Sequence, residues 1–249
     1  MKVLSIDWDY FIDCTSKERA ILFPDGGNEY ISPALQMFIW DSHYNTPDLQ
    51  RSYVGKSLEE IKIREKDFNA VLEIIKRFKG TVPPVVAISH RFIYPLIVDN
   101  SSPKTPIQLY NVDFHHDRYH YRNPDRGEVN CGNWVNYILE SRPNTEYYWI
   151  KREDSEEESL GGKVDYIPAT IEDLKEIDFD AIFLCRSDCW SPPHLDTYFN
   201  VLAKAMKKGR IAARVLPDIK QTGLMRKMCT SKIPKEYEIM QELRKLRVD

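Results

Sequence analysis

The segment Ile107-Gln108-Leu109-Tyr110-Asn111-Val112-Asp113-Phe114-His115-His116-Asp117 joins a short apolar strand to a cluster of polar side chains. Its first four residues have the composition of a buried β-strand, and Asp113, His115 and Asp117 follow at alternate positions. If the backbone stays extended, alternate side chains point the same way, so two carboxylates and one imidazole lie on one side. The Asp-x-His-x-Asp spacing therefore predicts a metal site at the end of a strand.

Two more strand ends carry groups of the same kind. Val3-Leu4-Ser5-Ile6 reads as an apolar strand followed by Asp7-Trp8-Asp9, and a third run, Val85–Ser89, ends at His90. Taken singly, Asp-Trp-Asp is more typical of a helix cap or solvated turn, and a lone histidine of a cap or core residue. Together the three strand ends offer six ligands, namely Asp7, Asp9, His90, Asp113, His115 and Asp117. This set predicts a binuclear centre, and its many oxygens suit Mn or Mg better than structural zinc.

Strand-like runs alternate with helical patterns along the chain. The runs are Val3–Ile6, Val85–Ser89, Ile107–Val112, Tyr147–Ile150 and Ala181–Cys185. Such alternation predicts the α/β class, with a mostly parallel central sheet in a three-layer α/β/α sandwich. Ligands of open α/β sheets bind at the carboxyl ends of strands, where every candidate ligand lies. No repeat or linker divides the sequence, so a single domain over residues 1–249 is expected.

Capping patterns indicate where helices begin. Ser57-Leu58-Glu59-Glu60 has capping-box spacing and predicts a helix from Ser57 that Gly80 stops. Thr170–Asp173 is expected to open a short helix, and Ser191-Pro192-Pro193 predicts one that runs to about Met206.

Two charged segments are expected outside the sheet. The acidic run Glu153–Glu158 and the following Gly161-Gly162 predict an exposed loop or hairpin tip. The tail from Lys232 to Asp249 predicts a charged amphipathic helix that docks on the sheet or on another subunit.

Composition excludes several classes of protein. The chain has 249 residues, 29% charged side chains and a formal net charge of −3, without a basic stripe, so no nucleic-acid partner is expected. It has no apolar run of about 18 residues and no signal-peptide layout, which predicts no membrane span and a cytoplasmic location. The five cysteines are odd in number and lack zinc-finger spacing, which favours reduced thiols. Cys185 and Cys189 are interpreted as core residues.

The ligand set resembles that of the ureohydrolase superfamily of arginases and agmatinases, which binds two Mn ions on an α/β/α sandwich. The family's Asp-x-His-x-Asp element matches Asp113, His115 and Asp117, and its early histidine matches His90. Its late Ser-x-Asp-x-Asp element matches Ser5-Ile6-Asp7-Trp8-Asp9. Because that element opens this chain, the resemblance implies an arginase-like fold in circularly permuted order.

A fourth segment resembles the family's substrate loop. Cys131-Gly132-Asn133-Trp134 is similar to Ser-Gly-Asn-x-His, but Val135 occupies the position of the family's histidine, so the proton shuttle differs. The order of the motifs and the Asp-x-Asp-Tyr-Phe sequence most resemble those of a divergent branch of the superfamily that includes peptide arginases. The resemblance covers roughly residues 2–136 and is thin over the last third of the chain.

The resemblance implies roles for individual ligands. Asp9 and Asp113 would bridge two Mn ions, and His90 and His115 would each bind one of them. Asp117 would carry a proton to the leaving amine, so Asp117 and His115 are the expected catalytic residues. His116 and His120 flank the centre and are candidates to support its ligands.

The substrate contacts are predicted from residues beyond these ligands. Asn133, Asp188 and Trp190 are the candidates. Asp188 either faces a guanidinium, pairs with Arg186 or caps a turn. Trp190 either forms the wall of a cation pocket or packs in the core. The 151–162 segment and the Asn133 loop are expected to flank an open cleft.

The function implied by this resemblance is hydrolysis of a linear amidine. Arginine side chains of a ribosomally made precursor peptide would become ornithine with release of urea. Free arginine or agmatine is an alternative substrate, and a Zn-dependent deacetylase or a non-catalytic metal-binding and partner-docking protein is a different outcome. A haloacid-dehalogenase phosphatase fits poorly, since it leaves Asp113, His115 and Asp117 unused. A homo-oligomer is left open.

Overall fold

The computed structural model describes residues 1–24, 33–119, 128–159, 162–207 and 214–215. The predicted tail helix at residues 232–249 lies outside these ranges, as do His120, Gly161 and Cys229.

A seven-stranded sheet forms the middle of the molecule, in the order β7-β4-β3-β1-β8-β2-β9, and all of its neighbouring strands pair in parallel. The strands are β1 (Lys2–Asp7), β2 (Val85–Ala87), β3 (Ile107–Val112), β4 (Thr145–Ile150), β7 (Ile167–Pro168), β8 (Ala181–Cys185) and β9 (Arg214–Val215). The five predicted strands are therefore confirmed, whereas β7 and β9 were not expected. The strand from Val3 to Ile6 lies inside the sheet beside β3, as a permuted order requires.

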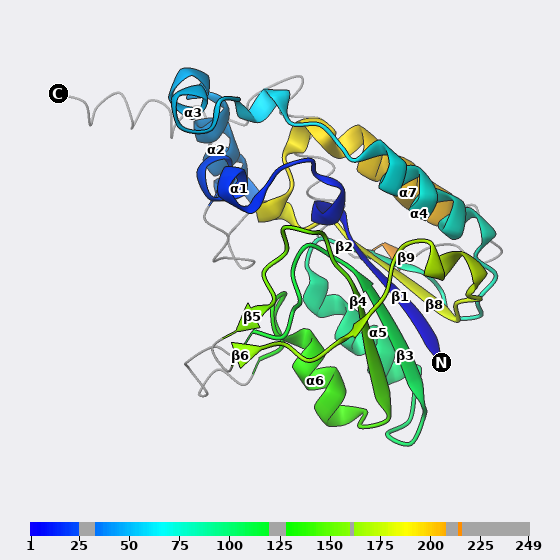
Figure 1. Cartoon of the computed structure of the whole chain (residues 1–249). Helices are drawn as coiled ribbons and strands as arrows, with labels where there is room; N and C mark the ends of the chain where they lie inside the picture. Colours follow the sequence, from blue (N-terminus) through cyan, green and yellow to red (C-terminus); the bar gives the residue numbers. More distant parts are fainter. Residues whose placement is uncertain (25–32, 120–127, 160–161, 208–213, 216–249) are drawn as a thin grey trace.

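Helices cover both faces of the sheet (Figure 1). Helices α4 (Glu65–Arg77) and α7 (Asp196–Lys207) pack on one face, and α5 (Ile93–Asp99) and α6 (Trp134–Ser141) pack on the other. Two separate apolar clusters fill the spaces between sheet and helices. Strand β1 contributes Leu4 and Ile6 to one cluster and Val3 to the other, because successive strand residues face opposite sides. This arrangement confirms the α/β class and is consistent with a three-layer sandwich.

Further elements lie beyond the carboxyl ends of the strands. Helices α1 (Ser16–Leu22), α2 (Pro33–Tyr44) and α3 (Pro47–Val54) group together there (Figure 1). Strands β5 (Glu158–Ser159) and β6 (Gly162–Lys163) form a small antiparallel hairpin, as the acidic run predicted. The short 3₁₀ helices are η1 (Trp8–Phe11), η2 (Leu58–Glu60), η3 (His90–Phe92), η5 (Asp173–Glu176), η6 (Asp188–Trp190) and η7 (Pro193–Leu195).

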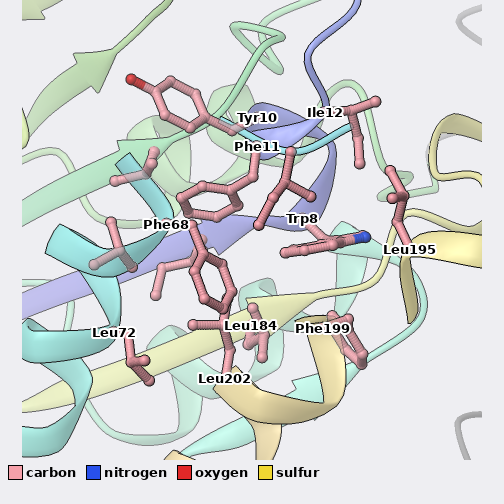
Figure 2. Packing of buried hydrophobic residues seen from close by; sticks show 14 of the residues in the cluster. Trp8, Tyr10, Phe11, Ile12, Phe68, Leu72, Leu184, Leu195, Phe199 and Leu202 are labelled. Carbon is pink, nitrogen blue, oxygen red and sulfur yellow. The ribbon is translucent and has the colours of Figure 1, made fainter. Parts of the chain in front are cut away.

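An aromatic cluster anchors the turn between Asp7 and Asp9. Trp8 is fully buried, with its ring 6.1 Å from that of Phe68 on α4 and 6.0 Å from that of Phe199 on α7 (Figure 2). Burial of a side chain of this size stabilises the fold by about 2–3 kcal/mol. Since Trp8 is fixed in the core, the two aspartates beside it have little freedom to move.

The prediction that a long helix starts at Ser57 was wrong. The capping box forms, but it closes only the 3₁₀ turn η2. The chain then runs extended, because Ile63 forms a bridge with Ile12 and Lys62 accepts a hydrogen bond from Asp13. Helix α4 begins at Glu65 and ends at Arg77, before Gly80.

The helices expected later in the chain form with small changes. A short 3₁₀ helix, η5, begins at Asp173. The Thr170 N–H donates to Asp173 Oδ2 at 2.8 Å, and the Asp173 N–H donates to Thr170 Oγ1 at 3.3 Å. The Ser-Pro-Pro segment opens η7, and α7 follows directly and contains Met206. Within the part of the chain that the structure describes, no helix is long and apolar enough to cross a membrane.

Candidate metal centre

Neighbouring strand ends bring the predicted ligands together. Strand β1 pairs with β3 on one side and with β8 on the other, and β2 lies next to β8. Asp7 ends β1, Asp113 follows β3, and His90 begins η3 shortly after β2. Because all four strands are parallel, their carboxyl ends meet at one edge, which is where open α/β sheets bind ligands.

One group of ligands surrounds His90. Its Nδ1 lies 3.1 Å from Asp7 Oδ2, 3.2 Å from Asp113 Oδ2 and 3.0 Å from Asp117 Oδ2. The other ring nitrogen, Nε2, is 2.6 Å from Ser5 Oγ, so the ring is held with Nδ1 towards the carboxylates. The ring also stacks on Phe183, with centroids 5.5 Å apart.

A second group surrounds His115. Its Nδ1 lies 3.1 Å from Asp9 Oδ2 and 3.9 Å from Asp113 Oδ1. The other oxygen of Asp9, Oδ1, is buried and has no hydrogen-bond partner among the described residues. A buried carboxylate oxygen without a partner is costly, so this atom is available to a cation.

Asp113 belongs to both groups. Its Oδ2 faces His90 and its Oδ1 faces His115. Asn111 donates to Oδ2 at 3.2 Å, the backbone N–H of His115 donates to Oδ1 at 2.8 Å, and Trp149 donates to the backbone carbonyl at 3.0 Å. Asp113 is thus fixed with one oxygen towards each imidazole.

The loop after β3 reaches this arrangement by turning, whereas the sequence suggested an extended backbone. The chain bends at Phe114 and His115, and Asp117 adopts a left-handed conformation with φ of 51°. Ser187, which donates to Asp7 Oδ2, has φ of 52°. Such conformations cost a non-glycine residue of order 1 kcal/mol and concentrate at functional sites.

Several residues that hold the ligands were not found from the sequence. Trp134 donates its indole N–H to Asp117 Oδ2, and Arg19 Nη1 lies 3.3 Å from Asp9 Oδ2. Ser187 is 180 positions from Asp7, and no spacing rule connects the two. Trp134 and Ser5 lay inside motifs that the sequence analysis quoted, but no pattern assigned either of them to holding a ligand.

The centre holds protons strongly in the absence of a cation. Burial, together with repulsion from neighbouring carboxylates, raises the pKa of Asp7 to about 6 and that of Asp113 to about 7. Burial opposes the charge on His115, but the Asp9 carboxylate prevails and raises its pKa to about 9. Burial also opposes the charge on His90, yet the three carboxylates that face its Nδ1 raise its pKa well above the usual value.

The geometry fits divalent cations. An octahedral shell with bonds of about 2.1 Å places neighbouring ligand atoms about 3.0 Å apart. The 3.0–3.2 Å distances around His90 Nδ1 match that spacing. His90, Asp113 and Asp117 have ligand atoms within 4.8 Å of one another, and so do Asp9, Asp113 and His115.

The chemistry of the ligands fits the same cations. Four carboxylates are nearly excluded from solvent, which requires compensating positive charge. Oxygen-rich sets with one imidazole for each group suit Mn or Mg. Cys185 Sγ lies within 4.8 Å of the Asp7 and His90 ligand atoms, but burial raises its pKa well above the usual value and keeps the thiol protonated. The four described cysteines are free thiols.

The proposed substrate residues have different surroundings. Trp190 lies at the centre, with its ring 4.9 Å from that of His115. Asp188 Oδ1 lies 3.4 Å from Arg186 Nη1, which is the ion pair that the sequence left open. The Asn133 side chain bonds to the backbone at Asn130 and Glu128, and its loop contacts Asp117 and Tyr119 through backbone hydrogen bonds.

The remaining candidates support neighbouring loops. His116 accepts from the Arg118 N–H at 2.9 Å and contacts the Glu158 carbonyl at 3.2 Å, which ties the β5–β6 hairpin to the ligand loop. Burial lowers the pKa of His116 to about 4, so its ring is neutral. Val135 belongs to α6, and its side chain is completely buried in the apolar cluster between α6 and the sheet.

Comparison with known proteins gives no independent assignment: no protein-family model, curated protein or solved structure matches this chain. The function is therefore argued from the geometry and chemistry of the site.

Proposed function

We propose that this protein is a hydrolase with two Mn ions that acts on a guanidinium group, in the manner of the ureohydrolases. The observation that carries the proposal is the orientation of Asp113, whose two oxygens face two different imidazole-containing groups. A carboxylate held in this way is suited to bridge two cations. A circularly permuted arginase-like fold accounts for the position of Asp7 and Asp9 at the start of the chain.

The proposed ligands divide between the two ions. Asp7, His90, Asp113 and Asp117 would hold one, and Asp9, Asp113 and His115 the other. The second bridge, which the resemblance implies for Asp9, stays a prediction, and Asp9 Oδ2 faces His115. Two such ions would supply an activated water at neutral pH, which a guanidinium carbon requires because resonance makes it a poor electrophile. The products from an arginine side chain are ornithine and urea.

Side chains of the protein would bind the substrate and move protons. Asp117 is fixed by the Trp134 indole and is proposed to pass a proton to the leaving amine, since Val135 has no group that could do so. Trp190, against His115, is proposed to contact the cationic substrate chain. Asp188 and Asn133 stay proposed substrate contacts. Asp188 would contact the substrate while it also forms its ion pair with Arg186.

An arginine within a precursor peptide is the proposed substrate. An enzyme for free arginine must recognise its α-carboxylate and α-amine, and Asn133 is the one candidate for that task among the predicted substrate contacts. Its amide is already bonded to its own loop. An internal arginine of a peptide offers neither group, so contacts along the peptide backbone would determine specificity. A cytoplasmic location stays a prediction.

The test is a comparison of substrates with Mn-loaded protein. We expect urea from an arginine-containing peptide, with a mass change from arginine to ornithine, and slower turnover of free arginine and agmatine. Asp188→Asn should reduce turnover while both ions stay bound. Faster hydrolysis of free arginine or agmatine than of the peptide would show that the substrate is a small molecule and not a peptide. Release of acetate from acetyl-lysine, without urea from any guanidine, would favour the deacetylase instead.

A further inference from the structure

Arg19 is a buried cation beside the proposed centre. It lies on α1 and is 4% exposed. Its guanidinium donates to three backbone carbonyls, those of Cys14 at 3.2 Å, Asp9 at 2.6 Å and Ile12 at 3.4 Å. These bonds do not involve any ligand side chain, so the guanidinium stays in place whether or not a cation occupies the centre.

The same guanidinium contacts two parts of the His115 group. Nη1 lies 3.3 Å from Asp9 Oδ2, the oxygen that also faces His115. Its Cζ lies 3.9 Å from the centroid of the Phe114 ring, and Phe114 stands between Asp113 and His115 in the chain. Arg19 thereby connects the end of β1 to the loop after β3.

This contact makes the two ligand groups unequal in charge. Three carboxylates face His90, from Asp7, Asp113 and Asp117. Only two of the predicted carboxylates face His115, one of them shared, and Arg19 already neutralises part of Asp9. A cation on the His115 side therefore meets less negative charge and a fixed positive charge.

We propose that Arg19 weakens the binding of the ion on the His115 side, so that this ion exchanges while the ion on the His90 side is retained. The inference rests on the binuclear centre proposed above. Because the charge is buried and cannot swing away, its repulsion is poorly screened and corresponds to about a tenfold or greater loss of affinity. Occupancy of the His115 side would then follow the supply of free metal.

The test is a titration of the metal-free protein with Mn²⁺. The electron paramagnetic resonance signal of the unbound ion measures how much Mn²⁺ remains free at each step. Arg19→Gln removes the charge but keeps an amide that can donate to a backbone carbonyl, and Arg19→Lys keeps the charge. Arg152→Gln is the matched control. Arg152 is also buried, donates to the carbonyls of Ile12 and Cys14 and lies over Phe114. Its carboxylate partner is Asp154, and its charge acts on Asp9 more weakly than that of Arg19.

The expected wild-type result is two binding constants that differ by about tenfold or more. Arg19→Gln should tighten the weaker one by about tenfold and leave the tighter one unchanged. Arg19→Lys should keep the wild-type difference, and Arg152→Gln should tighten the weaker constant clearly less than Arg19→Gln does. An unchanged weaker constant in folded Arg19→Gln, or equal tightening in Arg152→Gln, would overturn the role of Arg19.

The wild-type titration decides the matter even if Arg19→Gln does not fold. Two equal constants would overturn the role of Arg19 and leave the proposed function standing. A protein that binds no divalent ion would overturn the centre itself and the role of Arg19 with it.

Discussion

The His90 side and the His115 side of the proposed centre use the same kinds of ligand in different surroundings. The side chain of His90 is 1% exposed and that of His115 is 20% exposed. The His90 ring is enclosed by Phe183, Trp134 and Ser5, whereas the His115 ring meets Trp190 of η6.

This difference separates two tasks. The enclosed side is built into the core beneath α5 and α6, so its ligands contribute to the packing of the fold. The partly exposed side is the one through which the proposed substrate would reach the centre. Asp113 connects the two, because it is the one predicted ligand that faces both imidazoles.

Removal of the shared ligand should have the largest effect. Asp113→Asn keeps the size of the side chain but removes its charge from both groups, so we expect more than about a 100-fold loss of affinity for each ion and no detectable hydrolysis. Calorimetric titration with Mn²⁺ measures the affinities, and Asp48→Asn, on the exposed α3 surface, is the control. Normal binding of both ions to Asp113→Asn would contradict the shared role.

Removal of each imidazole should separate the two sides. His90→Ala should lose the His90-side ion and destabilise the metal-free fold by about 2 kcal/mol, since it removes a buried ring from the core. His115→Ala should lose only the other ion and destabilise the metal-free fold less than His90→Ala does, because His115 is partly exposed. Urea denaturation of the metal-free variants measures their free energies of unfolding. Equal losses of stability in His90→Ala and His115→Ala would show that the two sides contribute equally to the fold.

The pH dependence of metal binding follows from protons held in the centre. A cation must displace the protons of groups whose pKa values are about 6 for Asp7, about 7 for Asp113 and about 9 for His115. Apparent Mn²⁺ affinity should therefore rise as pH increases through this range. At neutral pH, binding should release protons, which calorimetry in two buffers of different ionisation enthalpy detects. An affinity that is constant between about pH 6 and pH 8 would contradict these pKa values.

The smallest expected effect concerns the backbone strain at Ser187. Ser187→Ala and Ser187→Gly both remove the hydrogen bond to Asp7, but only glycine adopts φ of 52° without strain. Ser187→Gly should therefore be more stable than Ser187→Ala, by about 0.5–1 kcal/mol. Thermal unfolding of the metal-free pair tests this, and the reverse order would mean that Ser187 is not strained.

The sequence predicted the strands and ligands but not how the loops turn. Strands such as Ile107–Val112 were predictable because buried parallel strands are continuous apolar runs. The ligands at their ends were predictable because parallel strands end at one edge of the sheet. The helix at Ser57 was placed wrongly because a capping box is a local signal, and the later bridge between Ile63 and Ile12 depends on distant residues.

The residues that hold the candidate ligands in place were harder to predict, because most of their contacts join parts of the chain that are far apart in the sequence. Trp134 reaches Asp117 from α6, and Ser187 reaches Asp7 from the loop after β8. Arg19 is near Asp9 in sequence, but an arginine on a charged helix is typical of a solvated surface. Its burial depends on how α1 packs beside the carboxyl edge of the sheet, which no local pattern reveals.

Anomalous diffraction from crystals grown with Mn²⁺ tests the central claim most directly. We expect two peaks for each chain, one in contact with His90 and the other with His115, with the two oxygens of Asp113 divided between them. A single peak, or two peaks that do not share Asp113, would contradict the binuclear centre.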